Sequence, residues 1–237
     1  MTVVLLDALG TLVELEQPWP HLVRELGRRG TRVTVEQARE AMLAEMAFYR
    51  AEHHRADTPD GLARLRRECA EVVLANLGPT GAATALGDVE AALLASVRFR
   101  AYPDAAPALR ALRVDGVALV VVSNWDVSLH AVLEQTGLSD LLDGALSSAE
   151  AGSAKPDPAI FARALALVGG LADDAFMVGD SVETDIQGAR RAGIAPVLVT
   201  RGDQRARGSQ NAGLAAPPGV PTLSSLGGLA ELVRYRR

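Results

Sequence analysis

Short runs of apolar residues alternate along most of the chain with segments in which apolar residues recur at helical spacing. The first run, Val3 to Leu6, is typical of a short strand that is buried on both faces. Similar runs predict strands at residues 117–122, 145–148, 176–178 and 196–200. Helical segments separate these runs, and the alternation predicts an α/β fold with a doubly wound, parallel, Rossmann-like sheet as its core. Residues 201–221, rich in glycine, alanine and proline, predict a mobile loop before a last helix.

Between residues 14 and 98 the pattern changes to helical spacing alone. Thr34 and Gln37 match a capping box, which predicts the start of one of these helices. No strand pattern is evident in this stretch. The sequence therefore predicts an all-helical cap domain at residues 14–98, inserted into a core domain made of residues 1–13 and 99–237.

The composition is that of an ordinary globular protein. Hydrophobic residues make up 49% of the 237 residues and charged residues 22%. Lys and Arg total 24 against 29 Asp and Glu, and the net charge of -5 gives no support to a general nucleic-acid-binding surface. No apolar run reaches membrane-spanning length. We therefore expect a small-molecule substrate as the partner, no nucleic acid and no membrane, and either a monomer or a homodimer.

The single cysteine, Cys69, excludes an internal disulfide and fits a reducing compartment. Its helical spacing with Leu65 and Val72 predicts a buried core position for it. Met1 is followed at once by the first strand-like run, so no signal-peptide pattern is visible. We expect a cytoplasmic protein.

The candidate functional residues lie where predicted strands end. Asp7, Ser123 and Asp180 each lie at the C-terminal end of a predicted strand. Ligands of open parallel sheets bind at that edge, near the point where the strand order reverses. Two carboxylates and a hydroxyl there could hold a cation and an oxyanion together. Structural roles stay open for each residue taken alone: a strand-end turn for Asp7, a helix N-cap for Ser123 and a negative helix start for Asp180.

Four segments resemble the motifs of the haloacid dehalogenase-like hydrolase superfamily, in the right order and at predicted strand ends. The segments are Asp7-Ala8-Leu9-Gly10-Thr11-Leu12, Val122-Ser123-Asn124, Lys155-Pro156 and Gly179-Asp180-Ser181-Val182-Glu183-Thr184-Asp185. A single match of this kind is weak, whereas the ordered set is specific. The predicted helical insert lies between the first and second motifs, where that family places a cap.

The resemblance implies a hydrolase that forms a covalent aspartyl intermediate at Asp7. Ser123 and Asn124 would hydrogen-bond the oxygens of the transferred group. Lys155 would act in catalysis and substrate binding by neutralising charge between nucleophile and substrate. The implied cofactor is Mg²⁺, which prefers carboxylates and retained waters. Its implied ligands are Asp7, the backbone carbonyl of Leu9, Asp180 and Asp185.

Leu9 departs from the family pattern, because phosphatases of the family have a second aspartate there as general acid and base. Such proton transfer typically contributes roughly 10²- to 10⁴-fold to the rate. The first interpretation is a phosphatase that acts on activated phosphates or takes its base from elsewhere, for example Glu14. The second is a 2-haloacid dehalogenase, whose halide leaves without a proton. The third is a non-catalytic phosphate-binding or regulatory protein with the same fold.

Overall fold

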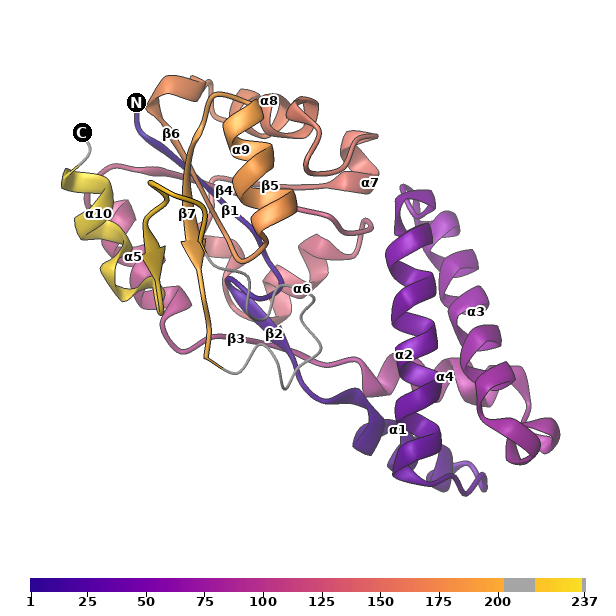
Figure 1. The fold of residues 1–237 in the computed structure, drawn as a ribbon. Coiled ribbons are helices and arrows are strands. Elements are labelled where there is room, and N and C mark those ends of the chain that lie inside the picture. The colour runs from indigo at the N-terminus through magenta and orange to yellow at the C-terminus, as the bar shows by residue number, and fades with distance from the viewer. Residues whose placement is uncertain (203–215, 236–237) are drawn as a thin grey trace. The chain divides into compact units, whose positions relative to one another are not determined.

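A computed structural model of the chain describes residues 1–202 and 216–235, which form two compact units (Figure 1). One unit comprises Met1–Glu14 and Arg100–Arg237, and the other comprises Leu15–Phe99. Most of the loop predicted at residues 201–221 lies outside the described residues. Among the described helices, none is both long and apolar enough to cross a membrane.

The first unit is built on a six-stranded sheet in which every strand pair is parallel. Across the sheet the strands are β5 (Gly144–Ser147), β4 (Ala118–Ser123), β1 (Val3–Leu6), β6 (Ala175–Gly179), β7 (Ala195–Val199) and β8 (Thr222–Leu223). The predicted parallel, doubly wound core is therefore confirmed. The edge strand β8 was not predicted, because two residues are too few to show a strand pattern.

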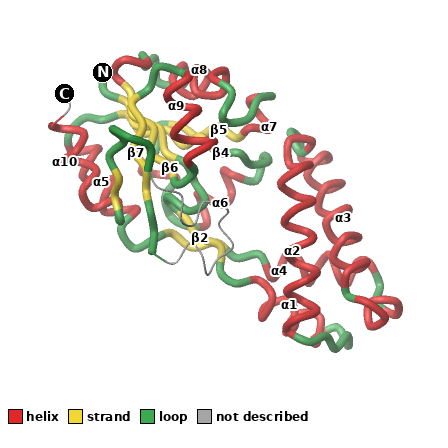
Figure 2. Tube along the Cα trace, in the orientation of Figure 1, coloured by secondary structure: helices red, strands yellow, loops and turns green. Residues whose placement is uncertain are grey.

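Helices cover both faces of this sheet (Figure 2). They are α5 (Ala105–Val114), α6 (Leu129–Gln135), α7 (Ser148–Ala151), α8 (Pro158–Ala166), α9 (Gly188–Arg191) and α10 (Leu229–Tyr235). Val3 and Leu5 of β1 share one core cluster with Ile160 and Phe161 of α8. All four residues of β1 are buried, since successive side chains of a strand point to opposite faces and both faces are covered.

Strand β1 lies at the point where the strand order reverses. The chain runs from β1 outward through β4 and β5, and then crosses to β6 and β7 on the other side of β1. Leu6 is in register with Val121 of β4 and Val178 of β6, and the amide of Asp7 donates to the carbonyl of Val178 at 2.9 Å. The C-terminal ends of these three central strands therefore lie together at one edge.

The second unit is a helical bundle with its own core. Its helices are α1 (Pro18–Arg28), α2 (Val35–Glu52), α3 (Pro59–Asn76) and α4 (Leu86–Ser96). The predicted capping box at Thr34 and Gln37 is present at the start of α2. The two ends of the helical stretch continue into short strands, β2 (Val13–Leu15) and β3 (Phe99–Ala101), which pair as a separate two-stranded sheet. The prediction that no strand occurs from residue 14 onward was wrong at Glu14 and Leu15, because a three-residue strand is too short to show alternation.

Glu45 is a buried carboxyl group in the core of the helical unit. Glu45 is 7% exposed. Its neighbour Cys69 is 3% exposed, which confirms the buried position predicted for that cysteine. Burial raises the pKa of Glu45 to about 6, against the opposing effects of a hydrogen bond with Cys69 and the charge of Arg50. The native state therefore binds the Glu45 proton more strongly than the unfolded chain does.

We expect the substitution Glu45→Gln to stabilise the protein at neutral pH and to have little effect near pH 4. Because the pKa of Glu45 is about 6 in the folded state against its ordinary value of 4.5, stability is lost as pH rises through this window. Removing the charge should raise the free energy of unfolding at neutral pH by up to about 2 kcal/mol. Urea denaturation at both pH values measures the difference. The exposed Glu40→Gln on the same helix is the control, and an equal effect of both substitutions would contradict the prediction.

Candidate active site

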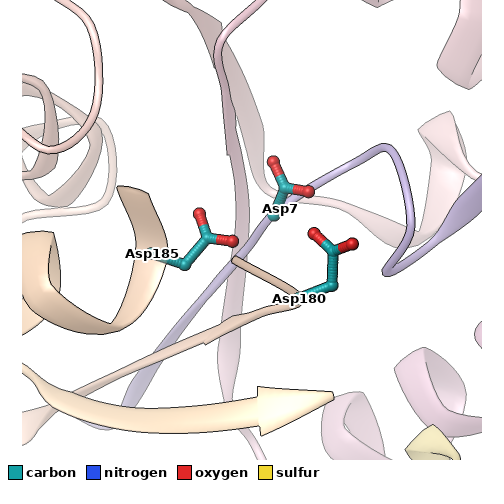
Figure 3. A group of neighbouring side chains, drawn as sticks. All are labelled: Asp7, Asp180 and Asp185. Carbon is teal, nitrogen blue, oxygen red and sulfur yellow. The ribbon is translucent and has the colours of Figure 1, made fainter. Parts of the chain in front are cut away.

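Three carboxylates converge at the reversal point of the sheet. Asp7 follows β1, Asp180 follows β6, and Asp185 lies in the turn after that strand. One oxygen from each lies within 4.8 Å of the others. Figure 3 shows the carboxyl groups turned toward a common space. The structure therefore brings together the three carboxylates for which the sequence predicted a metal site.

A π-helical turn, Val182–Gln187, places Asp185 in this cluster. The sequence predicted helical segments between the strands, but it did not predict the π-helical type of this one. Inside the turn, the Asp185 carboxylate accepts a hydrogen bond from the amide of Ser181 at 2.9 Å. A Cβ on Gly179 would overlap the Asp185 carboxyl group, so that position needs glycine. π-turns occur often at functional sites.

Gly10 allows the loop after β1 to pass close to Asp180. Its φ of 87° lies in the left-handed region that favours glycine. A Cβ at this position would overlap the carboxylate of Asp180. The glycine of the first motif is therefore needed both for the turn and for the approach of the two acidic segments.

Lys155 and Ser123 hold one oxygen of Asp7. The hydroxyl of Ser123 donates to Oδ1 of Asp7 at 2.9 Å, and the ammonium of Lys155 donates to the same atom at 2.6 Å. The ammonium also donates to Oδ1 of Asp185 at 2.6 Å. Among the described residues, no hydrogen bond falls on Oδ2 of Asp7. That oxygen is the one left for reaction at an electrophile.

The charges of this cluster do not balance. Burial disfavours the charge of Lys155, but Asp185 and Asp7 outweigh it and raise the pKa of that ammonium above its usual range. Burial, then Asp7, then Asp185 raise the pKa of Asp180 to about 8. Burial also raises the pKa of Asp185 to about 6, with Lys155 opposing and Asp7 adding to it. When all four groups are ionised, two negative charges remain in excess, and a divalent cation with oxygen ligands would balance them.

The other predicted site residues lie nearby but differ in what they contact. The side chain of Leu9 is 44% exposed in the loop after β1 and can transfer no proton. The side-chain amide of Asn124 bonds the backbone of Lys155 at 2.9 and 2.8 Å. Glu14 is buried and its carboxylate pairs with the guanidinium of Arg100, so it is already engaged in an ion pair.

Arg201 was not predicted to belong to the site. Its guanidinium donates to the carbonyl of Thr11 at 2.6 Å and to the carboxylate of Asp104 at 3.0 and 3.1 Å. It also stacks on the ring of Tyr102, 3.6 Å from the centroid. Arg201 thus braces the loop that carries Leu9 and Gly10. Its place just beyond β7, at the same edge of the sheet, was the one signal in the sequence.

A family model described as "haloacid dehalogenase-like hydrolase" matches residues 1–193. Ribulose-1,5-bisphosphate 5-phosphatase of Halopiger xanaduensis is 38% identical over 120 residues, which are 50% of this chain and 49% of that protein. Phosphoserine phosphatase of Thermus thermophilus is 39% identical over 106 residues, 44% of this chain and 43% of that protein. The matched stretch thus spans about half the length of these relatives or less.

Solved structures show the same fold. A phosphatase of this superfamily from Thermococcus onnurineus superposes with a TM-score of 0.65 at 23% identity, covering 98% of each chain. A 2-haloacid dehalogenase from Pseudomonas syringae superposes with a TM-score of 0.66 at 21% identity, covering 100% of each chain. On the family match, the chain belongs to the haloacid dehalogenase-like hydrolases.

We expect Mg²⁺ to stabilise the protein more strongly as pH rises. The pKa of Asp180 is about 8 in the folded state against its ordinary value of 3.8. Between these values the folded state binds more protons than the unfolded chain, so the metal-free protein loses stability with rising pH. A metal binds the deprotonated carboxylates and relieves this loss. The rise in melting temperature on adding MgCl₂ should therefore be small at about pH 5 and large at about pH 8.

The variant Asp180→Asn provides the control for this measurement. It removes one carboxylate of the cluster, the one whose pKa is raised to about 8. Its melting temperature should respond little to Mg²⁺ at either pH. An equal response of the native chain at both pH values, or a full response of the variant, would show that Mg²⁺ does not bind at this cluster.

Proposed function

We propose that this chain is a Mg²⁺-dependent phosphatase that forms a covalent aspartyl-phosphate at Asp7 and acts on small phosphorylated metabolites. The supporting observation is the arrangement around Asp7. Ser123 and Lys155 both donate hydrogen bonds to Oδ1 of Asp7, whereas Oδ2 has no such partner among the described residues. The carboxylates of Asp180 and Asp185 lie next to that of Asp7. The phosphatase relatives, matched over about half their length, favour the same class.

In the first step, Oδ2 of Asp7 attacks phosphorus, the new O–P bond forms, and the bond to the leaving oxygen breaks with its electron pair. Lys155 and Ser123 orient the carboxylate for this attack through their hydrogen bonds to Oδ1. Bound Mg²⁺, held by Asp7, Asp180, Asp185 and the carbonyl of Leu9, would neutralise charge on the phosphoryl oxygens. In the second step, water attacks phosphorus, which releases inorganic phosphate and restores Asp7.

Leu9 limits which leaving groups can depart. The hydrocarbon side chain of Leu9 cannot protonate the leaving oxygen. Glu14, the other acid considered for this step, is engaged in an ion pair with Arg100. An alkoxide leaving group would have to depart unprotonated, whereas the carboxylate of an acyl phosphate is stable as an anion. We therefore propose that activated phosphates are the preferred substrate class. We further propose that residues 14–98 act as the cap domain that sets specificity, since they lie between the first and second motifs.

We expect the native chain with Mg²⁺ to hydrolyse acetyl phosphate with a higher kcat/KM than it hydrolyses a sugar phosphate. The difference reflects the missing general acid, whose contribution is typically roughly 10²- to 10⁴-fold. Phosphate release measured across a substrate panel, with MgCl₂ or with a chelator, checks this. The variant Asp7→Asn and the chelated enzyme should both be inactive. A strong preference for sugar phosphates would contradict the assignment of substrate class.

The substitution Leu9→Asp should raise kcat on poor leaving groups while changing the rate on acetyl phosphate little. Leu9 is 44% exposed, so an aspartate there displaces little buried packing. The expected gain on a sugar phosphate is up to roughly 10²-fold, the lower end of general acid catalysis. Leu9→Asn, which has the same shape but is no acid, is the matched control. If both variants leave the rate unchanged, another group supplies the proton.

A 2-haloacid dehalogenase is the second candidate, and Leu9 is the observation that favours it, because halide leaves without a proton. The cluster of Asp7, Asp180 and Asp185 counts against it, since displacement of halide requires no metal. The discriminating measurement is chloride release from 2-chloropropionate in the presence of chelator. Release that depends on Asp7 would replace the phosphatase proposal.

A further inference from the structure

The side chain of Asn124 makes two hydrogen bonds to the backbone of Lys155. Its Nδ2 donates to the Lys155 carbonyl at 2.9 Å, and its Oδ1 accepts from the Lys155 amide at 2.8 Å. Both polar atoms of the amide are used on the donor and the acceptor of one residue. Such a pair of bonds fixes the place and the orientation of that peptide segment.

This contact joins two parts of the site that lie 31 residues apart in the sequence. Asn124 directly follows the central strand β4, whereas Lys155 lies in the loop between α7 and α8. A loop without a hydrogen-bonded ladder is the less rigid of the two partners. The asparagine therefore ties the lysine to the edge of the sheet from which Ser123 reaches Asp7.

The position of the Lys155 backbone matters because its ammonium must reach two carboxylates at once. It lies 2.6 Å from Asp7 and 2.6 Å from Asp185, and its side chain is only 2% exposed. A lysine side chain has four flexible bonds and loses much rotamer freedom when it is held in one conformation. Fixing the backbone at residue 155 reduces the number of conformations that must be excluded.

We propose that Asn124 is a positioning residue that acts on the reaction through Lys155 and does not itself contact the transferred group. The role in catalysis rests on the phosphatase activity proposed above, while the coupling between the two residues can be measured without any substrate. The family resemblance suggested instead that Asn124 binds substrate oxygens. The two roles make different predictions for a double mutant.

The neighbouring residue offers a matched control. The backbone of Trp125 is held by the side chain of Ser148, the first residue of α7, since its amide donates to the hydroxyl of Ser148 at 3.1 Å and its carbonyl accepts from that hydroxyl at 3.1 Å. Ser148 is buried, so Ser148→Ala also removes a buried contact beside β4. It leaves the contacts of Lys155 intact.

The first experiment measures how accessible Lys155 becomes. Chemical acetylation of the folded protein, followed by mass spectrometry of the peptide that contains residue 155, reports its labelling rate. Asn124→Ala should raise this rate about tenfold or more over the native chain, whereas Ser148→Ala should not. Thermal melts verify that both variants are folded at the labelling temperature. Equal labelling of Lys155 in the two variants would overturn the proposal, whether or not the chain is a phosphatase.

The second experiment is a double-mutant cycle on kcat/KM for acetyl phosphate with Mg²⁺. Asn124→Ala should lower the native rate by roughly 10- to 100-fold, the cost of a misplaced catalytic group. In a Lys155→Met background the same substitution should cost nothing further, because its one target is already absent. If instead the double variant loses kcat/KM by the product of the two single-variant factors, Asn124 contacts the substrate directly and the positioning role is rejected. If the native chain turns over no phosphate, the proposed function fails and the labelling result alone decides the coupling.

Discussion

The whole site depends on one buried ammonium among three carboxylates. Lys155 lies 2.6 Å from Asp7 and from Asp185, and Asp180 adjoins both. A single positive charge cannot balance three negative charges, and burial together with the charges of Asp7 and Asp185 raises the pKa of Asp180 to about 8. A divalent cation would balance the excess. The Mg²⁺ site proposed here rests on this excess of negative charge and on the backbone features that bring the three carboxylates together.

Those features belong to the backbone. The reversal of strand order at β1 brings the ends of β1, β4 and β6 to one edge, and glycines at 10 and 179 leave room that any side chain would fill. In the proposed mechanism, Leu9 leaves the nucleophile and the metal-binding carboxylates in place and removes only proton transfer. The framework thus accounts for hydrolysis as a class, and Leu9 for the kind of bond that can be broken.

The sequence was informative wherever a local pattern determines structure. Five sheet strands and the edge at which Asp7, Ser123 and Asp180 meet follow from apolar runs and from the rule for parallel sheets. The π-turn at Val182–Gln187 could not be predicted, because its spacing differs from an α-helix by one residue and leaves no separate apolar period. The contacts of Asn124 with Lys155, and of Arg201 with Thr11, join residues far apart in the chain and involve ordinary polar side chains. Only the folded backbone reveals such partners.

We propose that Asp7 and a divalent cation together receive a phosphoryl group. Beryllofluoride mimics a phosphoryl group bound to an aspartate, so ¹⁹F NMR of the protein mixed with beryllofluoride tests the claim without knowledge of the substrate. The account predicts bound fluoride resonances that require both Mg²⁺ and the carboxylate of Asp7, and that are absent in Asp7→Asn. No bound resonance in the native chain with Mg²⁺ would contradict it and favour a protein that keeps the fold without the chemistry.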